Sequence, residues 1–198
     1  MTSVEAYQAQ TAALAAGTAV QVAAVFAAVQ AGAIVTAEAA GFIAAVVNGA
    51  NASATTLADA YVSTRIETLT GVPTPTIGVP PVDATDRLEA AVQTILDEAE
   101  VPPTEPTASN GDAPSESLQK AQFRLTRLAQ SEPLITTQII AVEAMDKQPE
   151  VIGWRRVLDA DPCELCRFLY ANGRVYKTST MFQRHPNCNC QPEPVLAT

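Results

Sequence analysis

The cysteine and histidine residues of this 198-residue chain all fall in one short segment, between positions 163 and 190. The four cysteines and the single histidine follow the pattern C-x2-C, eighteen residues, then H-x2-C-x-C. A C-x2-C turn lets two thiolates meet one tetrahedral metal ion, and the second group of ligands then closes a loop over the residues between. A fold that uses these side chains together must bring the two ends of the segment side by side.

The predicted metal ligands are Cys163, Cys166, His185, Cys188 and Cys190. A structural zinc ion needs four ligands, so the expected set is the first three with either Cys188 or Cys190; the four cysteines with His185 beside them are the variant. Such a site contributes roughly 10–16 kcal/mol to folding, enough to stabilise a module with little core. Two disulfides, in any of three pairings, and four reduced thiols are the other outcomes that the spacing leaves open.

The single histidine limits the catalytic chemistry that the chain can perform. A Ser-His-Asp triad or a Cys-His nucleophile would have to use His185, which lies within the cluster. The residues from Pro162 to Cys166 match half of a zinc deaminase signature, but no histidine or cysteine precedes Cys163 to supply the third ligand. The sequence also lacks nucleophile-elbow and phosphate-binding glycine motifs. We therefore expect no catalytic residues and no organic cofactor.

Charge is divided unevenly along the chain. With 12 basic and 21 acidic residues the net charge is −9, which argues against a general nucleic-acid coat because clustered Lys and Arg must neutralise phosphates. Residues 1–152 hold 6 basic and 17 acidic side chains, whereas residues 153–198 hold 6 basic and 4 acidic ones. The basic side chains of the second part are candidates for contact with DNA: Arg155, Arg156, Arg167, Arg174, Lys177 and Arg184.

Alanine accounts for nineteen of the first fifty residues, and it is the best helix former. Residues 1–70 are therefore predicted to form an Ala-rich helical region of three helices. The second helix starts at a Thr36 cap and stops at Asn48-Gly49, and the third covers residues 53–69.

The stretch from Leu14 to Val35, in the first helix, carries no charge and is long enough to cross a membrane. Polar Thr18, Gln21 and Gln30, and the lack of flanking basic anchors, favour a helix of a soluble protein with a thin apolar face. A membrane-active segment is the alternative.

Proline-rich linkers with one helix are predicted for residues 71–114, because proline removes amide donors and favours extended backbone. The helix is expected at about 84–100, and the second linker, 101–114, is polar enough to be mobile. Helices follow over residues 115–150, with a cap at Ser115 and a fresh start at Ser131-Glu132-Pro133.

From residue 151 the pattern changes to short segments with tight-turn signals. Strands are predicted at 151–158, 174–177 and 190–195, and Asn172-Gly173 is a hairpin signal. The fold class is α+β: a mostly helical N-terminal part of Ala-rich helices and Pro-rich linkers, followed by a small α+β Cys/His module over residues 151–198.

The module resembles the C-terminal motif of the phage Mu F-like (MuF) head-morphogenesis family. The resemblance rests on a strand that contains Trp154, the segment Asp161-Pro162-Cys163-x-x-Cys166, a glycine turn, and the run from His185 to Cys190, HPNCNC. The family usually ends H-P-x-C-R-C, so this chain departs from the pattern at Asn189. The resemblance covers roughly residues 118–195.

The resemblance implies a structural, multi-copy minor capsid protein inside the head of a tailed phage, assembled in the bacterial host cytoplasm. The implied partners are the portal protein and a major capsid or scaffold protein, in procapsid assembly, DNA packaging or ejection. The alternatives are a capsid maturation protease, a zinc-stapled module that contacts packaged DNA, and a role of Leu14 to Val35 in the host membrane during ejection.

Overall fold

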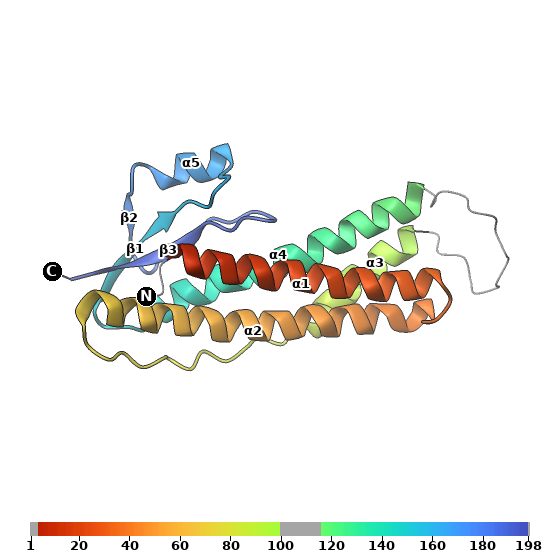
Figure 1. The fold of residues 1–198 in the computed structure, drawn as a ribbon, viewed down its shortest axis with the longest axis horizontal. Helices are drawn as coiled ribbons and strands as arrows, with labels where there is room; N and C mark the ends of the chain where they lie inside the picture. The colour runs from red at the N-terminus through yellow and green to blue at the C-terminus, as the bar shows by residue number, and fades with distance from the viewer. Residues whose placement is uncertain (1–3, 100–115, 198) are drawn as a thin grey trace.

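The computed structural model describes residues 4–99 and 116–197. Three long helices lie side by side along the molecule, a shorter helix packs against two of them, and an antiparallel sheet with a short helix covers one end (Figure 1). The elements in chain order are α1 Val4–Gln30, α2 Thr36–Thr70, α3 Thr85–Glu98, α4 Glu116–Asp146, β1 Val151–Val157, α5 Glu164–Tyr170, β2 Val175–Tyr176 and β3 Gln191–Leu196. The predicted α+β class is confirmed.

Helix α1 forms where alanine is abundant and Glu5 is the one charged residue, and its buried face includes Val22 and Phe26. It ends at Gln30, and Gly32 adopts a left-handed φ of 70° in the turn that follows. Among the described residues α1 is the one helix with the length and apolar composition of a membrane span, and 33% of its most apolar window is buried inside the protein. Membrane entry stays a prediction.

Helix α2 is continuous, so the predicted break at Asn48-Gly49 is wrong. The Asn48 amide group donates to Asp83 and Thr85 and accepts from the Ala84 N–H, which directs the side chain away from its own backbone. Glycine costs about 1 kcal/mol inside a helix, which the packed turns on either side offset. Thr36 is the first helical residue rather than the cap. The helix ends at Thr70, one residue beyond the predicted end at 69, and Gly71 is its C-cap with a left-handed φ of 72°.

The proline-rich segment after α2 packs along that helix (Figure 1). Asp59, which is 5% exposed, accepts the backbone N–H groups of Ile77, Gly78 and Val79 at 2.9, 2.7 and 3.2 Å. These bonds satisfy amides that extended backbone leaves without a ladder partner. The first linker is therefore held in place by the bundle.

Helix α4 runs without interruption through Pro133, so the predicted fresh start there is wrong. Proline removes one intrahelical bond, but buried Leu125 and Ala129 before it and Leu134 after it hold both halves in one line. The predicted cap at Ser115 and the linker 101–114 lie outside the described residues.

Two apolar clusters form the core. One lies among the helices, with Phe26, Ile43, Leu88, Leu96 and Leu125 at its centre. The other joins the helices to the C-terminal segment and contains Tyr7, Tyr61, Met145, Trp154 and Phe182.

The contact between the helices and the C-terminal segment includes two stacked tyrosines. The Tyr7 and Tyr61 rings stack at 3.9 Å between centroids, and the Tyr61 hydroxyl donates to the Pro192 carbonyl at 3.2 Å. The division into four sequence regions stays a prediction, but helices and C-terminal segment share one core.

Strand β1 lies at the centre of the sheet, with β2 and β3 antiparallel on either side. Asn172 and Gly173 have φ of 57° and 79°, as a tight turn requires, but the turn joins α5 to β2 instead of joining two strands as predicted. Gly153 is required by close packing, because a Cβ there would lie 2.3 Å from the Tyr176 carbonyl oxygen.

We predict that Asp59→Ala lowers the free energy of unfolding by about 3 kcal/mol, because three backbone amides lose their shared side-chain acceptor. Denaturant unfolding measures the change, with Glu67→Ala, at an exposed position of the same helix, as the control. Equal effects of the two substitutions would contradict the assigned role of Asp59.

Candidate metal centre

The two halves of the Cys/His pattern come from different elements. Cys163 is the N-cap of α5, and its sulfur accepts the Cys166 N–H at 3.4 Å, so C-x2-C spans the first turn of that helix. His185, Cys188 and Cys190 lie on the segment that leads from β2 into β3. Cys163 is exposed, whereas the other three cysteines are buried.

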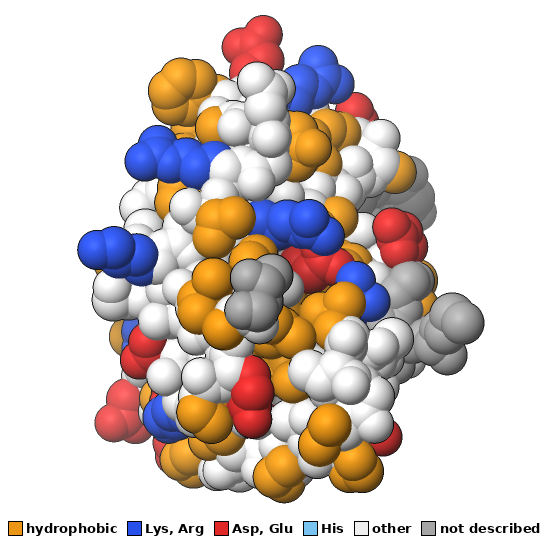
Figure 2. Space-filling view, turned by 90° about the vertical axis from the view of Figure 1, so that its left-hand side faces the viewer, with side chains coloured by type: hydrophobic (Ala, Val, Ile, Leu, Met, Phe, Trp, Pro, Cys, Tyr) orange, Lys and Arg blue, Asp and Glu red, His pale blue; other side chains and the backbone are white. Residues whose placement is uncertain are grey.

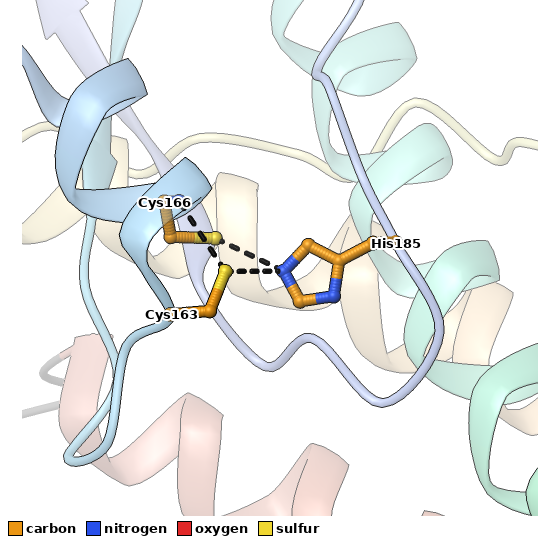
Figure 3. Close-up of side chains that lie close together, drawn as sticks. All are labelled: Cys163, Cys166 and His185. Carbon is orange, nitrogen blue, oxygen red and sulfur yellow. Dashed lines mark hydrogen bonds between the residues drawn. The ribbon is translucent and has the colours of Figure 1, made fainter.

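His185 faces the C-x2-C turn (Figure 3). Its Nε2 atom lies 3.1 Å from Cys163 Sγ and 3.3 Å from Cys166 Sγ, and its Nδ1 atom lies 3.1 Å from the Pro186 carbonyl oxygen. A carbonyl oxygen only accepts, so Nδ1 is the donor of this contact, and Nε2 is the nitrogen that faces the two sulfurs. A histidine that binds a metal ion through Nε2 uses its Nδ1–H in this way.

Cys166 lies close to ligands from both halves of the pattern, and it belongs to both groups of possible metal ligands. Its sulfur lies 3.5 Å from Cys188 Sγ, too far for the 2.05 Å bond of a disulfide, and all four cysteines are free. The donor atoms of Cys163, Cys166 and His185 lie within 4.8 Å of one another, as do those of Cys166, Cys188 and Cys190. The structure thus brings all five predicted ligands into one cluster that can hold a metal ion.

The buried sulfurs differ in acidity. Burial, with the neighbouring Cys188, raises the pKa of Cys166 to about 12. A hydrogen bond from Cys190 lowers the pKa of Cys188 to about 5, and the same bond raises the pKa of Cys190. A bound dication would hold the coordinating sulfurs as thiolates.

Residues of the helices that sequence reasoning missed hold this cluster in place. The Gln138 side chain of α4 is fully buried and donates to the carbonyls of Cys188 and Cys190 at 2.7 and 3.0 Å. Asn189 donates to the Gln8 carbonyl of α1 at 2.8 Å and accepts from Thr11 at 2.6 Å. The departure from arginine at position 189 thus coincides with a bond to α1. Buried glutamine in an apolar helix face is the signal that could have identified Gln138.

The six candidate DNA-contacting residues differ in exposure and in their partners. Arg167, Arg174 and Lys177 are exposed and Arg184 is half-buried, whereas Arg155 bonds Glu193 at 2.6 Å. Arg156 is 1% exposed, so its assignment to a DNA contact is wrong. On the end of the molecule that carries the sheet, basic side chains stand apart from one another (Figure 2).

We predict that Gln138→Leu lowers the free energy of unfolding by about 1–3 kcal/mol, because two buried carbonyls lose their donor while the volume is kept. Thermal or denaturant unfolding of the full chain checks this. The matched control is Gln122→Leu, at an exposed position of the same helix, and a loss no larger than in that control would count against the role of Gln138.

The comparisons with known proteins give one family. The model of the family described as VG15 protein matches residues 1–197. No curated protein and no solved structure matches the chain. The family match covers the helices and the Cys/His segment together, which are also the parts that share a core. The chain therefore belongs to the VG15 protein family, a virus- and phage-associated family.

Proposed function

We propose that this chain is a structural minor capsid protein of a tailed phage, which binds the portal protein inside the head and acts in head morphogenesis. The observation that carries the proposal is the Cys/His constellation of the MuF-like motif, gathered at one point and bonded to α1 and α4. Membership of a virus- and phage-associated family supports the setting.

The cluster serves as a structural zinc site. Its ligands are Cys163, Cys166, His185 and Cys188, because three of these donor atoms already surround one point and Cys188 Sγ is 3.5 Å from Cys166 Sγ. Cys190 lies beside this set, fully buried, and its sulfur accepts the Asp159 N–H at 3.4 Å. When bound, zinc would cross-link α5 to the segment before β3.

A structural role fits the surroundings of the histidine. The His185 Nε2 atom faces two cysteine sulfurs at once, as a metal ligand beside a C-x2-C turn does, and the Nδ1 contact is to a backbone carbonyl rather than to a carboxylate. Exposed apolar side chains on the helices, such as Phe42 and Phe123, are the candidate contacts for portal or capsid partners.

The zinc site predicts one zinc ion per chain in the purified full-length protein, measured by elemental analysis. Cys163→Ser and Cys188→Ser are expected to lose the ion, because each removes a ligand, and Cys190→Ser is the matched variant expected to keep it. A zinc-free protein with four titratable thiols would contradict the site. Zinc loss in Cys190→Ser but not in Cys188→Ser would make Cys190 the fourth ligand in place of Cys188.

The minor capsid role predicts that an affinity-tagged chain co-purifies with the portal protein from infected cells, and that mass spectrometry detects it in purified virions. Phe123→Ser is expected to weaken portal binding, with Thr94→Ser, at an exposed position of α3, as the control. Absence of the chain from virions and from portal complexes would reject the role, whatever the metal content.

A further inference from the structure

Arg156 is a buried cation beside the Cys/His cluster. It extends from β1, is 1% exposed, and its guanidinium lies 3.8 Å from the centroid of the Phe182 ring. Nη2 donates to the Gln183 carbonyl, Nη1 donates to Cys166 Sγ at 3.6 Å, and Nε is buried without a partner. A residue that the sequence places among surface cations therefore contacts the candidate metal ligands.

A buried guanidinium needs a negative charge nearby, because arginine stays protonated and desolvation of an unpaired ion costs several kcal/mol. The neighbouring Arg155 has such a partner in Glu193, which it shares with Arg65. Within residues 4–99 and 116–197, no carboxylate forms an ion pair with Arg156. The cysteine sulfur that contacts its guanidinium is Cys166 Sγ, which carries negative charge when it is a thiolate, as a metal-bound cysteine is.

The charge of the proposed zinc site supplies this partner. A zinc dication with three thiolates and a neutral imidazole carries one negative charge in excess. One arginine placed against a ligand sulfur makes the buried unit neutral. We propose that Arg156 is the counter-charge of a three-cysteine, one-histidine zinc site and strengthens its metal binding, an inference that rests on the zinc site proposed above.

The position of Arg156 also couples the two halves of the site. It reaches Cys166 of the C-x2-C turn with one nitrogen and the Gln183 carbonyl, two residues before His185, with the other. Phe182, on the same segment, packs against both the guanidinium and the Trp154 ring. Arg156 is therefore a positioning residue for the ligands as well as a charge.

A purely structural role for Arg156 is the competing explanation. Substitution by methionine, which has no charge, and by lysine, which keeps the charge, distinguishes the effect of the charge from the effect of packing. We expect Arg156→Met, which keeps the apolar length, to weaken zinc binding by the full chain about 10–100-fold, as losses outside the ligand shell do. Arg156→Lys, which keeps the charge, should restore most of the affinity. Arg155→Met, in the same strand but paired with Glu193, is the matched control.

Zinc affinity is measured by competition with a chelator, and cobalt(II) substituted for zinc reports thiolate ligation through its charge-transfer absorption. Equal weakening by Arg156→Met and Arg156→Lys would overturn the counter-charge. If Arg156→Met fails to fold, the zinc affinity of Arg156→Lys carries the test: an affinity near that of the wild type supports the counter-charge, and a loss of about 10-fold or more would overturn it.

A double-mutant cycle tests the charge directly. Cys163→His replaces one thiolate by a neutral ligand, so the zinc complex loses its excess negative charge. In that background the cost of Arg156→Met is expected to fall well below its cost in the wild type. An unchanged cost would overturn the inference while leaving the zinc site intact. A wild-type chain that binds neither zinc nor cobalt would reject the zinc site itself, and this inference with it.

Discussion

The C-terminal sheet is too small to bury a core of its own, so the arrangement of the C-terminal segment depends on packing against the helices. One of its three strands has two residues, so the sheet depends on apolar surface supplied by the helices. The stacked rings of Tyr7 and Tyr61 supply part of it, and the Tyr61 hydroxyl bonds directly to β3. The Cys/His cluster is consequently positioned by contacts with the helices as well as by the sheet.

Polar bonds at this junction complement the apolar contact. Gln138 satisfies two carbonyls of the ligand segment, and Glu193 of β3 pairs with Arg65 of α2 and with Arg155 of β1. Such groups stabilise only when paired, because each would be costly if buried alone. Among the described residues Arg156 forms no ion pair with a carboxylate, and the proposed zinc site would give it a partner of opposite charge. When occupied, the proposed site would hold the segment before β3 in a fixed position.

Local sequence signals predicted the elements better than their ends. Alanine abundance predicts α1 and α2, and the periodicity of Leu88 and Val92 predicts the buried face of α3, because both reflect short-range physics. The breaks expected at Asn48-Gly49 and at Pro133 are wrong because tertiary packing outweighed a local cost of one to a few kcal/mol at each position. The Asn172-Gly173 turn has the predicted backbone conformation, but the sequence did not show that α5 precedes it.

The sequence by itself determined that the chain is α+β and that the helices come first, and it identified five candidate metal ligands in one short segment. Composition, periodicity and ligand spacing suffice for these statements because each depends on residues close together in the chain. Only the tertiary structure decided that α1 and α4 hold the ligand segment and that Arg156 lies inside while Arg174 lies outside. These facts depend on contacts between residues far apart in sequence, such as Gln138 with Cys188 and Gln8 with Asn189, which no local pattern encodes.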